Sequence, residues 1–258
     1  MFNIPMKTSG AMSADSLLGL NTVSQSGLPS NNVGGGFNQP MNTAQPMNSG
    51  FNQQMSTAQP VPKQRPSGGG VHLKKGQKTP LAQGGQQLTQ IRVGLGWDLT
   101  NQACDLDASA FLLGANGKVV GDDWFVFYGQ ASSPDNAVIH SGDNSTGAGE
   151  GDDEIIDIDL TKLSPQVQKI TFVVTINEAK ERGQNFSMVK NAYARVVDKT
   201  TGNELVKFQL TDYFNTVTSM VVGEIYNKGG QWRFNAVGNG FDHDLGGLCG
   251  VYGVNVAD

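Results

Sequence analysis

Short apolar runs separated by glycine-rich turns constrain the fold of residues 71–258 more than any other feature. In the segment 154–160, isoleucine and leucine alternate with aspartate, and the segment 169–176 is almost wholly β-branched. A period of two places successive side chains on opposite faces of a strand. Turn dipeptides such as Asn116-Gly117 separate the runs. About eight or nine short strands at regular spacing predict an all-β fold, a β-sandwich of two antiparallel sheets.

The expected strands share β-branched or aromatic residues and are bounded by turn residues. They cover residues 90–97, 108–113, 124–128, 154–160, 169–176, 191–197, 204–210, 219–226 and 231–237. A short C-terminal helix is expected within residues 242–252, although Gly246, Gly247 and Gly250 lower the intrinsic helix preference there. A helical bundle is not expected, because glycine makes up 34 of the 258 residues.

Residues 1–70 have a composition unlike that of the rest of the chain. Among mostly Asn, Gln, Ser, Thr, Gly, Pro and Met they hold four charged side chains, Lys7, Asp15, Lys63 and Arg65. The ten residues from Phe37 recur from Phe51 with eight positions identical. Such a segment cannot bury enough apolar surface to offset its ordering entropy. We expect a disordered tail over residues 1–70, either a Phe/Met segment for weak association or a low-complexity extension, and a folded domain over residues 71–258.

Charge and composition exclude several classes of protein. The formal net charge of −5 argues against a nucleic-acid binder, which usually carries a basic stripe. No apolar stretch of about 18 residues is present, so no transmembrane segment is expected. The first residues show no basic region followed by an apolar core, and the two cysteines, Cys104 and Cys249, are too few for a disulfide scaffold. These features indicate a cytoplasmic protein with buried thiols.

Acidic residues concentrate in one window of the domain. Between Asp98 and Asp159 there are thirteen Asp or Glu residues and one basic residue, Lys118. Outside this window the domain has fourteen basic and nine acidic residues. Like charges a few ångströms apart repel, and a folded site that crowds them loses stability unless a cation neutralises them. The window therefore predicts a cation site.

Two clusters within the window suit such a site. The first consists of Asp98, Asp105 and Asp107, and the spacing of the last two puts both carboxylates on one side of an extended chain. The second is the segment 141–154, whose glycines let the backbone curl and expose carbonyls. From 143 to 154 it spans the twelve residues of an EF-hand loop, but its sixth position is alanine and a strand follows it. The alternative for this segment is an acidic, solvated loop.

The donors in the second cluster indicate which cation it would take. All of its side-chain donors are oxygens, since it contains no His or Cys. Carboxylates, amide oxygens and backbone carbonyls are the ligands of Ca²⁺, which takes about 6–8 of them, whereas Mg²⁺ keeps more water. Zinc and copper favour His or Cys ligands. We expect calcium, and two ions, because the carboxylates exceed the need of one.

These clusters together resemble the signature of the TerD family of tellurite-resistance and stress-response proteins. The segments that carry the resemblance are Gly96-Trp97-Asp98, Asp105-Leu106-Asp107-Ala108-Ser109 and residues 141–154. Residues 71–78 and 246–256 resemble the family's first strand and C-terminus, so the resemblance covers about residues 71–256. It implies a calcium-binding β-sandwich with a cytoplasmic role in resistance to tellurite and other stresses. Its implied partners are calcium and other TerD-like or stress-complex proteins.

Carried over residue by residue, the resemblance implies metal ligands in both clusters. The first choices are Asp107, Asp143, Asn144, Asp152, Asp153 and Glu154, the second choices are Asp98 and Asp105, and Gly147 and Gly149 would contribute carbonyls. Asp157 and Asp159 are expected only to lie on the outer face of a strand. If a strand and the loop share one ion, Asp107→Asn and Asp153→Asn should act non-additively on calcium binding.

Two hypotheses for function remain. The first is a calcium-binding stress-response module without catalytic activity. The alternative is a cyclic AMP-binding protein of the same family, with residues 183–185, residues 238–240 and Arg182 or Arg195 as candidate phosphate contacts, although no P-loop is present. A hydrolase is not expected, because no histidine has the spacing of a metal ligand or catalytic base and no Gly-x-Ser-x-Gly motif occurs.

Overall fold

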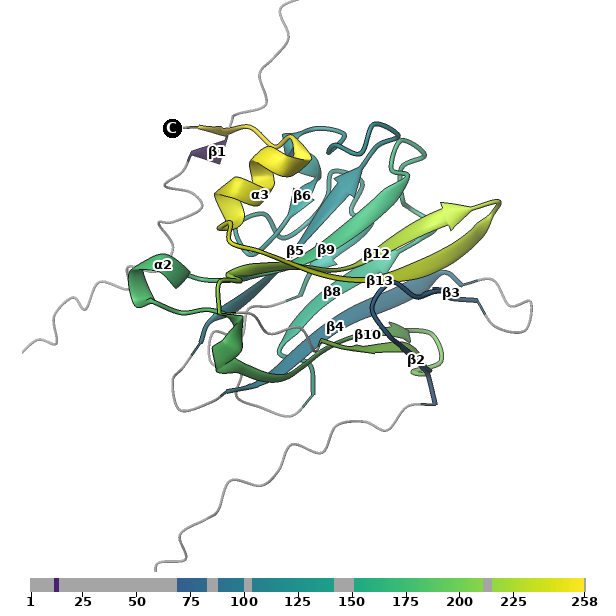
Figure 1. Cartoon of the computed structure of the whole chain (residues 1–258). Coiled ribbons are helices and arrows are strands. Elements are labelled where there is room, and N and C mark those ends of the chain that lie inside the picture. Colours follow the sequence, from purple (N-terminus) through teal and green to yellow (C-terminus); the bar gives the residue numbers. More distant parts are fainter. Residues whose placement is uncertain are drawn as a thin grey trace, which may run out of the picture. The chain divides into compact units, whose positions relative to one another are not determined.

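The protein is a β-sandwich. The structure, a computed structural model, describes residues 12–13, 69–82, 88–99, 104–141, 151–210 and 215–257. These residues form two six-stranded sheets packed face to face, with a short helix near the C-terminus (Figure 1). The predicted fold class is therefore confirmed. Most of the tail predicted over residues 1–70 lies outside the described residues, so its disorder and the boundary near residue 70 stay predictions.

Sheet 1 has the strand order β2-β11-β10-β4-β8-β7. Its strands are Val71–Leu73 (β2), Gln90–Leu99 (β4), Val138–His140 (β7), Glu154–Asp159 (β8), Val189–Asp198 (β10) and Glu204–Gln209 (β11). Neighbouring strands run antiparallel except for β2 and β11, which pair in parallel. The strands β10 and β4 are therefore central, and β2 and β7 form the two edges.

Sheet 2 has the strand order β3-β13-β12-β9-β5-β6, and its pairs are all antiparallel. Its strands are Lys78–Pro80 (β3), Leu106–Leu113 (β5), Phe125–Val126 (β6), Lys169–Ile176 (β9), Ser219–Lys228 (β12) and Gln231–Phe241 (β13). A separate two-stranded parallel pair joins Met12–Ser13 (β1) to Val256–Ala257 (β14).

The main core fills the space between the two sheets. In sheet 1 it contains alternate residues of β4 and β8, because period-two alternation turns one face of each strand inward. In sheet 2 it contains the even-numbered residues of β5 and β9. The core residues of these four strands are Ile91, Val93, Leu95, Trp97, Ile156, Ile158, Leu106, Ala108, Ala110, Leu112, Ile170, Phe172, Val174 and Ile176.

A second apolar layer lies on the outer face of sheet 2, beneath the helix Leu245–Tyr252 (α3) (Figure 1). There Leu248 and Cys249 pack with Phe111 and Val173. This layer explains why every residue of β5 is buried, since one face meets the core and the other meets α3.

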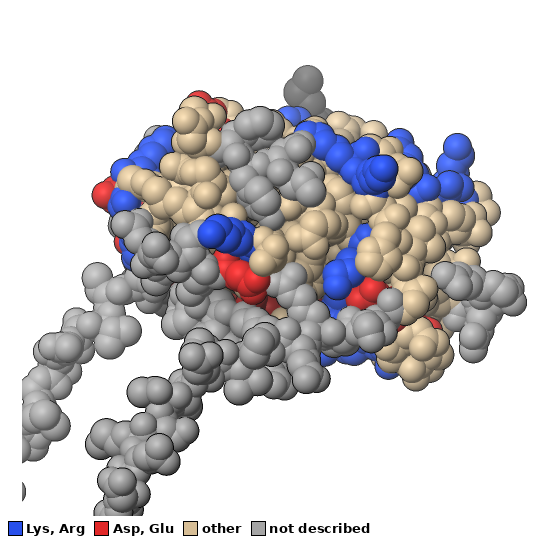
Figure 2. Space-filling view, turned by 60° about the horizontal axis from the view of Figure 1, so that its bottom comes forward, with Lys and Arg blue, Asp and Glu red and all other residues tan. Residues whose placement is uncertain are grey.

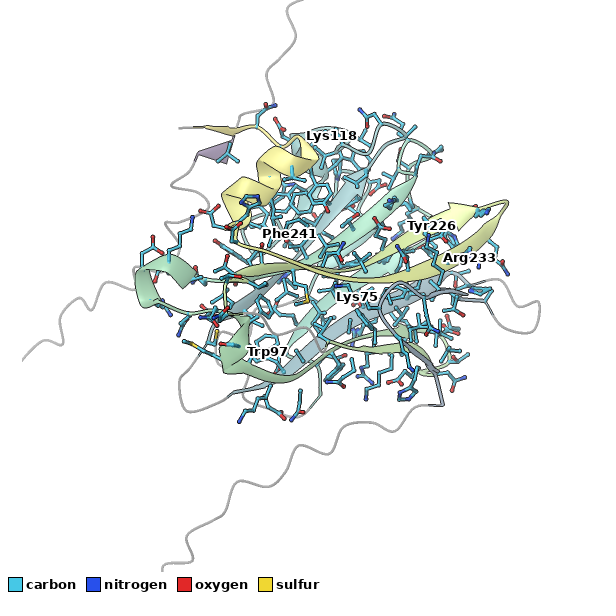
Figure 3. The ribbon with its side chains drawn as sticks, in the orientation of Figure 1. Lys75, Trp97, Lys118, Tyr226, Arg233 and Phe241 are labelled. Atoms are coloured by element: carbon cyan, nitrogen blue, oxygen red, sulfur yellow. The ribbon has the colours of Figure 1, made fainter. Side chains whose placement is uncertain are left out.

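The helix α3 confirms the expected C-terminal helix despite its three glycines. The side chain of Asp244 caps it by accepting a hydrogen bond from the Gly247 N–H at 2.8 Å. Lys118 lies beside its last turn (Figure 3) and donates from Nζ to the carbonyl oxygen of Val251 at 2.6 Å. Capping and tertiary contacts thus outweigh the low helix preference of glycine.

Short elements depart from the predicted pattern. The strand predicted over residues 124–128 is only partly correct, because Asp122–Trp124 forms a 3-10 turn (η2) and Phe127 exchanges two backbone hydrogen bonds with Gln130 in a tight turn. The remaining helical elements of the described chain are Ala179–Arg182 (α2) and Phe186–Met188 (η3).

Candidate metal site at the loop end of the sandwich

Strand direction brings the two acidic clusters to the same end of the molecule. β4 ends at Leu99 and β5 begins at Leu106, while β8 runs antiparallel to β4 with Glu154 opposite Leu95. The connection before β5 and the connection before β8 therefore both emerge where β4 ends. We call this the loop end of the sandwich. It holds each predicted metal ligand that the structure describes.

Asp153 is fixed directly against β4. Its backbone N–H donates to the carbonyl oxygen of Leu95 at 2.7 Å, and its Oδ2 accepts a hydrogen bond from the Trp97 N–H at 2.9 Å. Asp153 is buried. Trp97, whose N–H donates to Asp153, is labelled in Figure 3. The acidic loop thus returns to the sheet beside the Gly96-Trp97-Asp98 motif.

Asp98 and Asp105 accept hydrogen bonds from asparagine side chains. Asn191 donates from Nδ2 to Oδ2 of Asp98 at 2.7 Å, and Asn177 donates from Nδ2 to Oδ2 of Asp105 at 3.1 Å. Asn177 also donates its backbone N–H to the carbonyl oxygen of Asp105 at 2.9 Å. Both carboxylates therefore have a fixed orientation at the loop end.

Asp107 belongs to the other sheet and faces away from the core. It pairs with Thr175 on β9, and it lines a cavity of about 210 Å³ beneath the start of α3. Glu178 and Asp244 line the same cavity. Because packed sheets lie about 10 Å apart, the outer face that carries Asp107 is separated from the outer face of sheet 1 by the full thickness of the sandwich.

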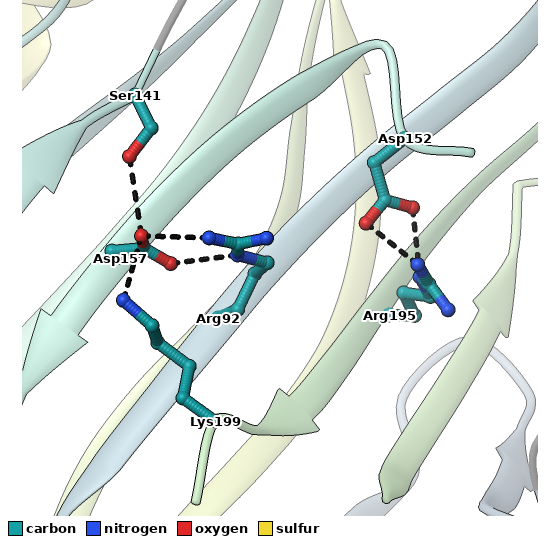
Figure 4. Close-up of polar contacts among 6 residues, drawn as sticks. All are labelled: Arg92, Ser141, Asp152, Asp157, Arg195 and Lys199. Atoms are coloured by element: carbon teal, nitrogen blue, oxygen red, sulfur yellow. Dashed lines mark hydrogen bonds and ion pairs between the residues drawn. The ribbon is translucent and has the colours of Figure 1, made fainter. Parts of the chain in front are cut away.

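Asp152 lies over the outer face of sheet 1 and is held by Arg195 (Figure 4). Arg195 donates from Nε to Oδ1 at 2.7 Å and from Nη2 to Oδ2 at 3.0 Å. The hydroxyl of Tyr193 donates to Oδ1 at 2.9 Å. The side chain of Asp152 is 2% exposed, so the carboxylate of this bidentate pair is shielded from water.

Two glycines of β4 make room for this arrangement. A Cβ at Gly94 would overlap the carboxylate of Asp152, and a Cβ at Gly96 would collide with the ring of Tyr193. Arg195 pairs with Gly94 and Tyr193 pairs with Gly96 across β10 and β4. The alternating glycines therefore form a shallow trough into which larger side chains from β10 and the acidic loop pack.

Glu154 points into the sandwich. It shares the inward face of β8 with Ile156 and Ile158, and its Oε2 lies 3.0 Å from Nε2 of His140. Both side chains are buried. Glu154 therefore approaches the loop end from the interior, between the two sheets.

The predicted ligands thus share one end of the molecule but not one face. Asp98 and Asp152 lie on the outer face of sheet 1, Asp107 lies on the outer face of sheet 2, and Glu154 lies between the sheets. Asp143, Asn144, Gly147 and Gly149 lie outside the described residues. Within the described ranges, no group of three or more His, Cys, Asp or Glu residues could hold a metal ion.

Much of the acidic charge in the sequence window is balanced by residues from outside it. Arg92 donates to both oxygens of Asp157 at 2.8 and 3.0 Å, and Lys199 donates to the same carboxylate at 2.8 Å. Burial alone would raise the pKa of Asp157, but the hydrogen bonds from Arg92 and Lys199 outweigh it and hold that pKa below its ordinary value. On this face acidic and basic side chains lie in adjacent groups (Figure 2).

Sequence reasoning missed Arg195, Tyr193 and Glu204 as neighbours of the acidic loop. Glu204 Oε2 lies 3.7 Å from Nη1 of Arg195. These residues stand far from the loop in the chain, and only the pairing of β4 with β10 brings them to it. The signal that could have found them is a Gly-x-Gly pattern in one strand that can face a Tyr-x-Arg pattern in another.

The residues of the alternative functions have other partners. Arg182, a candidate phosphate contact, pairs with Glu178 at 2.6 Å, and Arg195 pairs with Asp152. Cyclic AMP binding stays a prediction.

Both cysteines are buried as predicted, and burial raises the pKa of Cys104 to about 11 and that of Cys249 to about 12. Neither thiol is therefore a ready nucleophile.

Membrane crossing by a helix finds no support in the part of the chain that the structure describes. None of the helices there is long and apolar enough to span a bilayer.

Comparison with known proteins identifies similar chains. A family model described as the TerD domain matches residues 70–252. The tellurium resistance protein TerD of Serratia marcescens is 44% identical over 190 residues, covering 72% of this chain and 99% of that protein. The general stress protein 16U of Bacillus subtilis is 42% identical over 191 residues, covering 72% of this chain and 98% of that protein.

A solved structure is also similar to this chain. A homologue of the telluride resistance protein TerD from Streptomyces coelicolor A3(2) is 25% identical, with a TM-score of 0.50. The match covers 67% of this chain and 100% of that one.

Proposed function

Because the chain belongs to the TerD family of tellurium-resistance and stress-response proteins, we propose that it is a non-catalytic stress-response module that binds calcium at the loop end of the sandwich. We place its action in the cytoplasm, together with other TerD-like or stress-complex proteins. The observation that carries the calcium proposal is the convergence of both acidic clusters on one end, where Asp153 is hydrogen-bonded to β4 next to Asp98.

The donor set fits a hard cation. The loop-end side chains of Asp98, Asp105, Asp107, Asp152 and Asp153 offer carboxylate oxygens, and the segment 141–154 adds an amide oxygen and glycine carbonyls. Calcium tolerates irregular geometry and a mixture of these ligands, whereas magnesium demands a near-octahedral site with more water. The bound ion would neutralise carboxylates and join the acidic loop to the sheets.

Two ions fit the arrangement better than one. Asp107 faces outward from sheet 2, while Asp98 and Asp152 lie on the outer face of sheet 1. A single ion with ligands at about 2.3–2.6 Å does not span the thickness of a sandwich. We therefore propose one ion on each side of the loop end.

The test is a calorimetric titration of the full chain with Ca²⁺ and then with Mg²⁺. We expect about two calcium ions to bind and Mg²⁺ to compete poorly. A ligand that binds only the native state adds about 2.7 kcal/mol at a hundredfold excess over Kd. Chelator should therefore lower the Tm of the calcium-loaded protein. A Tm that is the same with and without chelator would contradict the proposal.

Variants at the two sheets decide whether one ion is shared. Asp107→Asn and Asp153→Asn should each weaken Ca²⁺ binding, while Asp242→Asn, whose side chain is 79% exposed, should leave it unchanged. With two separate ions the losses in binding free energy should add in the double variant. Non-additive losses would instead support the shared ion that the sequence alone predicts.

A further inference from the structure

Arg195 lies between two buried carboxylates. Its Nε and Nη2 donate to Asp152 at 2.7 and 3.0 Å, while its Nη1 lies 3.7 Å from Oε2 of Glu204. The side chains of Arg195, Asp152 and Glu204 are 14%, 2% and 3% exposed. One guanidinium thus forms ion pairs with two carboxylates that are both shielded from water.

The two carboxylates differ in their hydrogen bonding to Arg195, which donates to Asp152 and not to Glu204. Within the described residues, neither side-chain oxygen of Glu204 has a hydrogen-bond partner, although both are buried. An ionised carboxylate without hydrogen bonds in a buried site is unfavourable, and a nearby charge compensates only part of the lost solvation. The charge of Arg195 is therefore shared between two carboxylates, and both side-chain oxygens of Glu204 remain unsatisfied acceptors while Arg195 stays on Asp152.

We propose that Arg195 exchanges carboxylates when calcium binds. In this exchange the cation takes over Asp152 at the loop end, and the guanidinium shifts onto Glu204. The proposal rests on the calcium-binding function proposed above. On the Glu204 side the movement is small, because Nη1 must close from 3.7 Å to an ordinary hydrogen-bond length of about 2.9 Å.

Charge and hydrogen bonding both favour the exchanged state. The cation replaces the positive charge that Asp152 loses, and Glu204 gains the charged hydrogen bonds that it lacks. The cluster then has positive charge for both carboxylates instead of one. A cation at Asp152 and a guanidinium at Glu204 thus stabilise each other.

The exchange carries the effect of calcium across sheet 1 to its opposite edge. Glu204 begins β11, and β11 pairs with β2, the first strand of the domain. Gly70, just before β2, packs so closely on Glu204 that a Cβ there would lie 2.9 Å from the Glu204 carbonyl oxygen. A rearrangement at Glu204 should therefore change the backbone environment of Gly70 and Val71.

The experiment compares Glu204→Gln with the wild-type full chain by calcium titration. Glutamine keeps the shape of the side chain but removes the charge that draws Arg195 away from Asp152. We expect Kd for Ca²⁺ to rise about tenfold, the equivalent of one charged hydrogen bond. Glu224→Gln is the matched control, because Glu224 pairs with Lys169 at 2.8 Å in sheet 2, and its Kd should stay within twofold of wild type.

A second measurement follows the backbone amide resonance of Val71 during the titration. It should shift in the wild type and stay in place in Glu204→Gln. Should Glu204→Gln fail to fold, the wild-type resonance decides: a calcium-dependent shift supports the exchange, and none overturns it. Unchanged affinity in a folded Glu204→Gln variant overturns the exchange alone, whereas wild-type protein that binds no calcium overturns both the exchange and the proposed function.

Discussion

Two ion-pair clusters on the outer face of sheet 1 have opposite imbalances, and Figure 4 shows the arginine–aspartate pair of each. Near the loop end, one guanidinium lies between two carboxylates, Asp152 and Glu204. Further along β8, two cations, Arg92 and Lys199, share the single carboxylate of Asp157. In the first cluster one cation is paired with two carboxylates, and in the second two cations are paired with one, although both use arginine–aspartate pairs of nearly the same geometry.

The difference separates the place where we propose a cation from one whose carboxylate is already paired with two cations. At Asp157 two cations already offset the cost of burial, which is why its pKa stays low. At Arg195 burial would lower the pKa, but the hydrogen bond and charge of Asp152 outweigh that effect and raise it. Of these two clusters in the acidic sequence window, only the one near the loop end has more carboxylates than paired cations, which suits the proposed ion.

The largest effect should come from removing each arginine in turn. Arg195→Gln leaves two buried carboxylates without a counter-charge, so we expect a loss of about 3–5 kcal/mol in the free energy of unfolding. Arg92→Gln leaves Asp157 with Lys199, and because Arg92 is 36% exposed the loss should stay below about 1 kcal/mol. Urea unfolding of the calcium-free proteins measures both. Equal losses of unfolding free energy in the two variants would contradict the proposed difference between the clusters.

A smaller effect should come from filling the trough under Asp152. In Gly94→Ala the added methyl group overlaps the Asp152 carboxylate and displaces it from Arg195. Such overpacking typically costs about 1–3 kcal/mol of unfolding free energy. Gly114→Ala is the control, since the nearest atom to its Cβ would lie at an ordinary contact distance of 3.5 Å. If both variants unfold at the same urea concentration, the trough does not hold Asp152 in place.

The smallest effect concerns how the free energy of unfolding changes as the pH falls. The folded-state pKa of Asp157 is lowered, so its ion pairs contribute stability above the ordinary aspartate pKa of about 3.9 and lose it as the pH falls through the lowered value. Asp157→Asn removes that contribution. Between pH 7 and pH 3 the variant should therefore lose less unfolding free energy than the wild type, by less than about 1 kcal/mol. Parallel pH profiles from urea unfolding would show that Arg92 and Lys199 contribute nothing at Asp157.

The long strands were predictable because their side chains repeat with a clear period. The segments 169–176 and 204–210 match β9 and β11 to within a residue. β3 and β7 were not predicted, since each has three residues and too few apolar positions to show a period. Their place at or beside a sheet edge is decided by partners far along the chain.

The site was predictable in position but not in detail. Residues of one acidic signature were expected to converge, and the described ones do meet at one end. That Asp107 faces one side and Asp152 the other follows from their strands lying in different sheets, which spacing along the chain does not reveal. Likewise, a count of charges in a sequence window could not include Arg195, because β10 supplies it from 43 residues beyond Asp152.

The first two strands of the domain have a consequence for how the chain matures during synthesis. β2 completes sheet 1 and β3 completes sheet 2, yet Val71 pairs with Val206 and Pro80 pairs with Arg233. At ribosomal rates of roughly 5–20 residues per second, Pro80 waits on the order of ten seconds for its partner. Until then neither sheet has all its strands. The sandwich therefore closes late, and a chain truncated before β13 would release β12 with a bare edge open to pairing with another molecule.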